Sequence, residues 1–156
     1  MLNHTQLKQI WGQVPPDYYQ KSTQGNLLQR YWHRQKVKTL TRVVGKTKPK
    51  TILDVGSASG MMTNEVSKIF LEAKITAVDV YQKAVVYGRK NYPHIKFLVA
   101  DAHNLPFADN TFDLVICYET IEHVVDPLNV IYEIKRAVKK KGAAVIAMDS
   151  GNWAFR

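Results

Sequence analysis

The stretch Thr51-Ile52-Leu53-Asp54-Val55-Gly56-Ser57-Ala58-Ser59-Gly60 decides the fold of this chain of 156 residues. Residues 51–55 are apolar and β-branched enough to form a buried strand, and the small residues that follow break it. Gly56 and Gly60 permit backbone conformations, and a close approach of a ligand, that a Cβ would obstruct. We therefore expect a strand, a ligand-binding loop, and a helix that begins near Gly60 and directs its N-terminus at the ligand.

A second acidic strand end follows this loop. Asp79 lies 19 residues after Gly60, at the end of the apolar run 75–78. An acidic side chain about 20 residues after such a loop typically accepts the ribose hydroxyls of a nucleoside. The two features together predict a bound nucleoside.

The charge and the spacing of the loop indicate which nucleoside it is. A dinucleotide pyrophosphate is anionic, and the Asp54 carboxylate directly before the loop would repel it. The loop reads Asp-x-Gly-x-Ala-x-Gly, so the dinucleotide pattern Gly-x-Gly-x-x-Gly is not met. S-Adenosylmethionine carries a sulfonium and an ammonium group instead. Charge and spacing therefore both favour S-adenosylmethionine as the cofactor.

Residues 51–148 resemble the class I S-adenosylmethionine-dependent methyltransferases, in particular the type-11 group that includes the ubiquinone and menaquinone biosynthesis C-methyltransferases. The family loop reads Asp-x-Gly-x-Gly-x-Gly, and this chain has Ala58 at the middle glycine. Three later segments are similar to the family in the expected order. They are the third strand with the adenine segment at 97–107, the fourth strand with the cofactor-facing turn at 112–124, and the helix and Lys-Gly turn at 131–142.

The resemblance also implies site residues. Asp101 would accept a hydrogen bond from the adenine amino group, and the backbone of Ala102 would contact the ring. The residues expected to bind S-adenosylmethionine, or its product S-adenosylhomocysteine, are Asp54, Gly56, Ser57, Ala58, Gly60, Asp79, Val80, Asp101, Ala102 and Tyr118.

Methyl transfer requires few side chains, because the sulfonium already activates the methyl group and the protein chiefly aligns the acceptor and excludes water. The catalytic residues are therefore unknown from the sequence. Glu119 and His123 are candidates, with a solvent-facing carboxylate and a structural histidine as the alternatives. Cys117 is expected in the core. The histidines lack the spacing of metal ligands, so no metal site is predicted.

The excess positive charge lies in the N-terminal third. Residues 1–50 contain 10 Lys and Arg and a single acid, whereas residues 51–156 contain 12 basic and 12 acidic residues. This fits an anionic partner or, as the favoured reading, a solvated helix face. The segment 17–33 loosely resembles the N-terminal part of the quinone methyltransferases. There Tyr18, Tyr19, Trp32 and His33 would form a lid over cofactor and acceptor, or would only dock a helix onto the sheet.

The apolar pattern predicts the order of the elements. Helices are expected near 2–11, 26–44, 60–72, 81–91 and 127–140, and strands near 51–55, 74–79, 95–99, 112–117 and 143–148. This alternation predicts an α/β fold, with a Rossmann-like, doubly wound, mainly parallel sheet in three α/β/α layers and ligands at the carboxyl ends of the strands. Residues 1–50 would be a basic helical segment on the lid and substrate side. Residues 51–156 would be the cofactor-binding domain, C-terminally truncated and without the family's last two strands.

Composition limits the remaining possibilities. A hydrophobic fraction of 46% is ordinary for a soluble globular domain, and no apolar run is long enough for a membrane span, so a cytoplasmic protein is expected. An exposed edge at the fifth strand predicts a homodimer. The leading function is methyl transfer to a small molecule, with a lipophilic or quinone-like acceptor as its narrower form. The alternatives are a methyltransferase of a macromolecule, with nucleic acid less favoured because no RNA-binding pattern accompanies the charge, and a non-catalytic S-adenosylmethionine-binding module.

Overall fold

The computed structural model describes residues 13–18, 20–21, 27–44 and 47–148. The predicted helix at 2–11 and Tyr19 lie outside these residues. The elements, in chain order, are α3 (Leu27–Val44), β1 (Thr51–Val55), α4 (Met61–Ile69), β2 (Lys74–Asp79), α5 (Gln82–Asn91), β3 (Lys96–Val99), β4 (Phe112–Tyr118), the 3-10 helix η1 (Ile121–His123), α6 (Pro127–Ala137) and β5 (Val138–Ala147).

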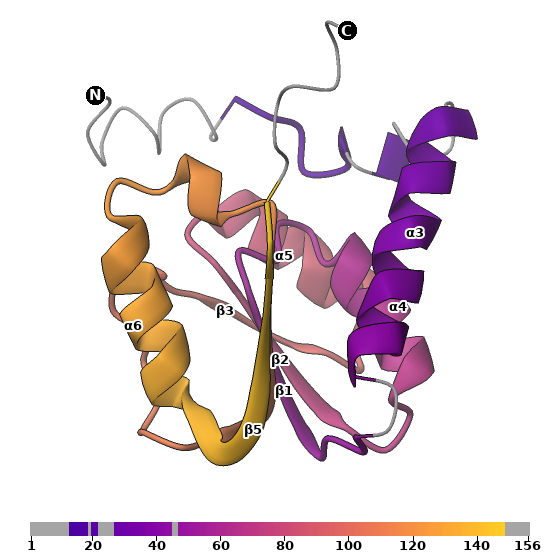
Figure 1. Ribbon diagram of the computed structural model, residues 1–156. Helices are drawn as coiled ribbons and strands as arrows, with labels where there is room; N and C mark the ends of the chain where they lie inside the picture. The colour runs from indigo at the N-terminus through magenta and orange to yellow at the C-terminus, as the bar shows by residue number, and fades with distance from the viewer. Residues whose placement is uncertain (1–12, 19, 22–26, 45–46, 149–156) are drawn as a thin grey trace, which may run out of the picture.

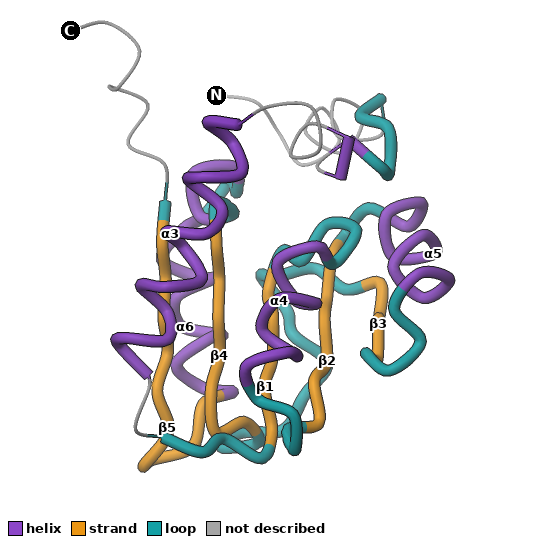
Figure 2. Tube along the Cα trace, turned by 90° about the vertical axis from the view of Figure 1, so that its right-hand side faces the viewer, coloured by secondary structure: helices purple, strands orange, loops and turns teal. Residues whose placement is uncertain are grey.

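The strands form one parallel sheet in the order β3-β2-β1-β4-β5 (Figure 2). The order reverses next to β1, because the chain first extends the sheet through β2 and β3 and then returns to the other side of β1 with β4. In open α/β sheets such a reversal leaves a crevice at the carboxyl ends of the strands, where ligands bind. The predicted Rossmann-like fold is confirmed.

Helices cover both faces of the sheet (Figure 1). One buried cluster joins α3, α4 and α5 to the sheet and includes Leu40, Ile52 and Val66. The other joins α6 to the opposite face and includes Leu53 and Ile134. Neighbouring residues of β1 enter different clusters because successive side chains of a strand point to opposite faces. The chain is thus a three-layer α/β/α structure.

The boundary between α6 and β5 differs from the prediction. The helix ends at Ala137 rather than at residue 140, and Val138 already pairs with Phe112 of β4. The ladder then shifts register, as it does at a bulge. Lys139 forms an ion pair of 2.8 Å with Asp113 of β4. The predicted helix included residues 138–140, two of which are lysines. Lysine is a good helix former, but strand pairing overrides that weak preference.

The other predicted boundaries agree with the structure to within three residues. In the described part of the chain, no helix combines the length and the apolar character that a membrane crossing requires.

Candidate cofactor site

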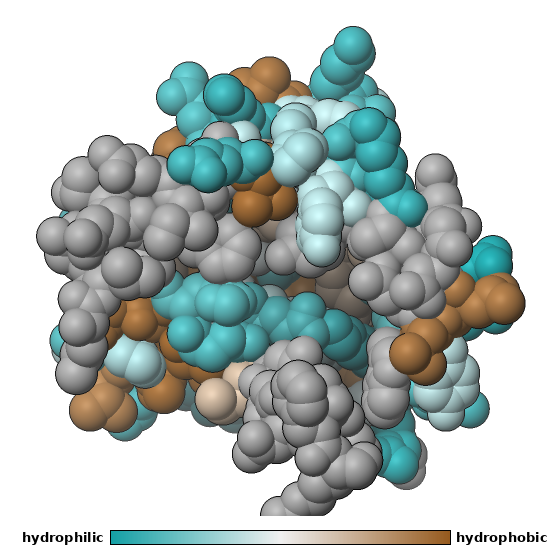
Figure 3. Space-filling model, turned by 90° about the horizontal axis from the view of Figure 1, so that it is seen from above, coloured by the Kyte–Doolittle hydropathy of each residue, from teal (hydrophilic) through white to brown (hydrophobic). Residues whose placement is uncertain are grey.

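A cavity opens at the carboxyl ends of β1, β2, β3 and β4, where the fold predicts a ligand. Its open volume is about 1040 Å³ with the solvent at its mouth included. Seen from this end, the molecule shows hydrophilic residues (teal) between hydrophobic ones (brown) (Figure 3). The described residues that line the cavity are Val14, Pro15, Pro16, Gly56, Ala58, Ser59, Val78, Asp79, Val80, Tyr81, Ala84, Ala100, Asp101, Ala102, His103, Glu119, Thr120, His123, Val124 and Val125.

Asp79, the last residue of β2, is fixed by backbone hydrogen bonds. Its Oδ2 accepts from the Ala58 N–H at 2.7 Å, and its Oδ1 accepts from the Tyr81 N–H at 2.8 Å. Burial raises the pKa of this carboxyl group, and the backbone donors oppose that rise. The carboxylate therefore ties the loop after β1 to the end of β2 and holds a fixed acceptor at the cavity wall.

The two glycines of the loop are required by the protein's own packing. Gly56 has a φ of 76°, and a Cβ there would lie 2.1 Å from Thr120 Oγ1. Gly60 has a φ of 84°, and a Cβ there would lie 2.3 Å from Phe97 Cζ. Residues with a side chain rarely adopt this left-handed backbone conformation, and neighbouring side chains already occupy the space that a Cβ would need at both glycines. The absent Cβ atoms thus make room for Thr120 and Phe97.

Asp54 lies beneath the loop and does not line the cavity. Its side chain is buried, and its Oδ2 accepts a hydrogen bond of 2.5 Å from Thr63 Oγ1 on α4. Burial, together with the negative charge of Asp79, raises the pKa of Asp54 to about 7. Asp54 is therefore not a fully formed negative charge at neutral pH, and it cannot by itself set the charge preference of the site.

Three other carboxylates give the cavity its charge. Asp79, Asp101 and Glu119 line it, and no lysine or arginine does so among the described residues. Lys36 of α3 approaches from outside and forms an ion pair with Glu119. A cleft lined by one sign of charge concentrates ligands of the opposite sign. The cavity therefore suits a cation better than a pyrophosphate.

Comparison with known proteins identifies the family. The family described as "Methyltransferase domain" matches residues 53–146, which is more than half of the chain. The chain belongs to this family. Its relatives include the demethylmenaquinone methyltransferase of Thermotoga maritima, which is 29% identical over 109 residues covering 70% of this chain and 48% of the relative. The methyltransferase domain described here thus spans about half the length of the curated relatives it matches.

Solved structures confirm the fold of this methyltransferase domain. The [4+2]-cyclase SpnF aligns with a TM-score of 0.76 at 22% identity, over 90% of this chain and 58% of that one. A SAM-dependent methyltransferase from Aquifex aeolicus aligns with a TM-score of 0.70 at 22% identity, over 86% of this chain and 72% of that one. Such low identities show the fold alone. The cofactor implied by the family is S-adenosylmethionine, as the sequence predicted.

The structure brings most of the predicted cofactor residues together. Gly56, Ala58, Asp79, Val80, Asp101 and Ala102 line the cavity. Asp54, Ser57, Gly60 and Tyr118 do not. Ser57 is buried, and its Oγ has no hydrogen-bond partner among the described residues. Tyr118 packs against the core cluster on the α3 side of the sheet, and its burial raises its pKa to about 12.

Both candidate catalytic residues line the cavity. Glu119 follows β4 with a φ of 50°, a left-handed conformation that is uncommon for a residue with a side chain. His123 ends η1. Cys117 is buried in the core, as predicted.

The N-terminal residues that line the cavity are not the ones that the sequence predicted. Residues 14–16 form part of its wall, although the sequence indicated only the end of a helix there. The Tyr81 hydroxyl donates to the Val14 carbonyl at 3.1 Å, and the Gln20 amide donates to Ser59 Oγ at 3.0 Å. No spacing in the sequence links this segment to the loops of the sheet, because the contacts are long-range.

The structure describes the side chains of two residues proposed for a lid, and neither of them lies at the cavity. Tyr18 is exposed and His33 is half-buried on α3, and neither lines the cavity. His33 Nε2 has no partner within the described part of the chain, and burial lowers the pKa of this histidine. The Trp32 side chain lies outside the described residues, as Tyr19 does.

Proposed function

We propose that this methyltransferase domain binds S-adenosylmethionine in the cavity and transfers its methyl group to a small molecule by in-line displacement. The single observation that carries the proposal is the charge of the lining, with Asp79, Asp101 and Glu119 present and no described lysine or arginine. A cofactor with a sulfonium and an ammonium group matches this lining. A dinucleotide would place its phosphates against carboxylates.

The residues that would hold the cofactor follow from their positions. Asp79 would accept the ribose hydroxyls, since backbone donors from Ala58 and Tyr81 already fix its carboxylate. Asp101 and Ala102, after β3, would receive the adenine. S-Adenosylmethionine supplies an activated methyl group, and the chain's own task is to align an acceptor atom with it and to exclude water.

The acceptor would lie beside the wall formed by residues 14–16. Residues 14–16 are apolar, and so are Val124 and Val125, which also line the cavity; this favours a lipophilic acceptor. Residues 1–50 would accordingly act on the lid and substrate side, although Tyr18 and His33 do not line the cavity in this structure. The relatives named demethylmenaquinone methyltransferase support a quinone-like molecule as the narrower form. Glu119 and His123, also on the lining, would take a proton if the acceptor atom carries one.

One observation favours a macromolecular acceptor as the second candidate. Arg30, Arg34, Lys38 and Arg42 are all exposed and recur every fourth residue along α3. This spacing places them along one side of the helix. Such a stripe suits an anionic polymer, RNA above all, and the sequence of α3 contains no acid to oppose it.

Transfer of a radiolabelled methyl group tests the proposal. The purified chain with labelled S-adenosylmethionine should label a reduced quinone lacking the methyl group, and an Asp79→Asn variant should not. A Glu72→Gln variant, which loses an exposed carboxylate outside the cavity, is the matched control. Label in RNA or protein in place of the quinol would favour the second candidate. RNA retention that falls with salt and is lost in Arg34→Glu would support it further. Cofactor binding without label in any acceptor would favour the non-catalytic module.

A further inference from the structure

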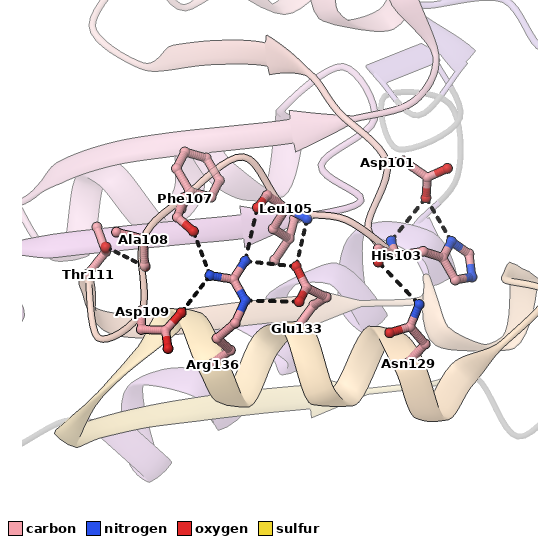
Figure 4. A network of polar contacts seen from close by, with 10 residues as sticks. All are labelled: Asp101, His103, Leu105, Phe107, Ala108, Asp109, Thr111, Asn129, Glu133 and Arg136. Atoms are coloured by element: carbon pink, nitrogen blue, oxygen red, sulfur yellow. Dashed lines mark hydrogen bonds and ion pairs between the residues drawn. The ribbon is translucent and has the colours of Figure 1, made fainter.

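We propose that His103 is a positioning residue that holds the Asp101 carboxylate so that the site selects a 6-amino purine, a role that rests on the proposed function. His103 forms two hydrogen bonds with one oxygen of Asp101 (Figure 4). Its backbone N–H donates to Oδ1 at 3.0 Å, and its ring Nδ1 lies 2.7 Å from the same oxygen. Both residues line the cavity.

The ring of His103 is held at both nitrogens. The backbone N–H of Asp126, at the start of α6, donates to Nε2 at 3.3 Å. A backbone N–H can only donate, so Nε2 must present its lone pair, and the proton of the neutral ring lies on Nδ1. Nδ1 therefore donates to Asp101. This tautomer makes the histidine a bridge from the N-terminus of α6 to the carboxylate.

The backbone around His103 is anchored to α6 as well. The Asn129 side-chain amide donates to the His103 carbonyl at 3.1 Å. Further along the loop, Glu133 accepts from the Leu105 N–H at 2.8 Å, and Arg136 donates to the Leu105 carbonyl at 3.0 Å (Figure 4). Glu133 and Arg136 also pair with each other. The loop that holds Asp101 is therefore fixed on a rigid helix, which a precise binding contact requires.

This arrangement has a consequence for specificity. An ionised carboxylate only accepts hydrogen bonds, so it favours an amino group at the purine 6-position and repels a carbonyl oxygen there. Donation from Nδ1 stabilises the ionised form and restricts rotation of the carboxylate. Without that donor, the Asp101 side chain can turn, and a 6-oxo purine meets less resistance.

Two substitutions distinguish the hydrogen bond from His103 to Asp101 from the one between His103 and Asp126. His103→Asn places an amide N–H at the position of Nδ1 and keeps the bond to Asp101. His103→Gln places an amide oxygen near the position of Nε2, which accepts from Asp126, and loses the donor to Asp101. Calorimetric titration with S-adenosylhomocysteine and with S-inosylhomocysteine measures the preference for the amino group. His94→Ala, at an exposed loop position outside the cavity, is the matched control.

We expect the wild-type chain, His103→Asn and His94→Ala to bind S-adenosylhomocysteine more tightly than S-inosylhomocysteine. In His103→Gln the ratio of the two affinities should fall roughly tenfold. Asp101→Asn should lose the preference too, and adding His103→Gln to it should change nothing more. An unchanged preference in His103→Gln, or equal affinities for both compounds in the wild type, would overturn the role of His103. Ring nitrogen NMR of the wild-type chain gives an independent check, since a proton on Nε2 of His103 would also overturn it. Failure of the wild type to bind S-adenosylhomocysteine would instead contradict the proposed function.

Discussion

The ammonium group of Lys36, on α3, forms an ion pair with the carboxylate of Glu119, which lines the cofactor cavity. Glu119 stands in a left-handed turn after β4, and its N–H donates to the Ala147 carbonyl of β5 at 2.7 Å. The basic N-terminal helix is thus joined directly to the acidic site. This pair moderates the negative charge that the cavity presents to a cation.

Changing either partner should alter the preference of the cavity for a charged cofactor. S-Adenosylmethionine carries the sulfonium charge and S-adenosylhomocysteine does not, so their affinity ratio reports the potential inside the cavity. Lys36→Met should raise the affinity for S-adenosylmethionine relative to that for S-adenosylhomocysteine, and Glu119→Gln should lower it. Each change should be roughly threefold at low salt. Calorimetric titration measures both affinities. Lys38→Met, on the exposed side of the same helix, should leave the ratio unchanged. A shift in the same direction for both variants would argue against this role of the pair.

The buried Asp54 should make stability depend on pH. Its pKa in the folded chain is raised to about 7, so the folded state binds this proton more tightly than the unfolded state. Its contribution to stability is therefore complete below about pH 4 and is lost as the pH rises to 7. Asp54→Asn has no proton to lose and should not show this pH dependence. Urea titrations at several pH values should show its free energy of unfolding, relative to the wild type, rise between about pH 4 and 7 and then level off.

Asp113 provides a contrast of opposite sign. Hydrogen bonds from Lys139 lower its pKa to about 2, with donors from Thr51 and Lys50 adding to the effect. Its contribution is present above about pH 4 and is lost as the pH falls toward 2. An Asp113→Asn variant should therefore be less stable than the wild type at neutral pH and approach it in acid. If the free energy of unfolding of Asp54→Asn, relative to the wild type, fell or stayed constant between about pH 4 and 7, the raised pKa of Asp54 would be contradicted.

Ala58 occupies a left-handed conformation with a φ of 47°. A residue with a Cβ in this region costs roughly 1 kcal/mol relative to glycine. Ala58→Gly should therefore raise the melting temperature or leave it unchanged, in spite of the entropy that glycine adds to the unfolded chain. Ala58→Val should lower it, because a β-branched side chain tolerates this conformation least. Thermal unfolding by circular dichroism compares the three chains. A lower melting temperature for Ala58→Gly would contradict the strain assigned to this residue.

The sequence predicted the fold well because its signals were local. The β-branched run 51–55, the acidic end of β2 at Asp79 and the alternating elements each follow from neighbouring residues. Residues 138–140 were assigned wrongly to a helix, because pairing with β4 is a contact that no local propensity reports. The contribution of Val14 to the cavity wall was missed for the same reason. Asp54 was expected at the ligand, and only the structure shows that the strand turns it toward Thr63.

The edge of the sheet gives a prediction about assembly. β5 pairs only with β4 among the described residues, and Ile146 is 39% exposed. An unpaired parallel edge with an exposed apolar side chain can pair with a second copy. Light scattering should show a mass that rises from monomer to dimer with concentration, and Ile146→Lys should prevent the rise. Leu71→Lys, which changes a residue that is 85% exposed between α4 and β2, is the control. A monomeric mass at every concentration would contradict the predicted homodimer.

Binding of the sulfonium cofactor is the central claim, and calorimetric titration of the purified chain tests it most directly. S-Adenosylmethionine and S-adenosylhomocysteine should each bind saturably at a single site, and NAD should not bind. Asp79→Ala should lose both ligands, because it removes the acceptor that Ala58 and Tyr81 hold at the cavity wall, whereas Glu72→Gln should bind as the wild type does. Heat of binding for NAD, or none for either sulfur nucleoside, would contradict the account.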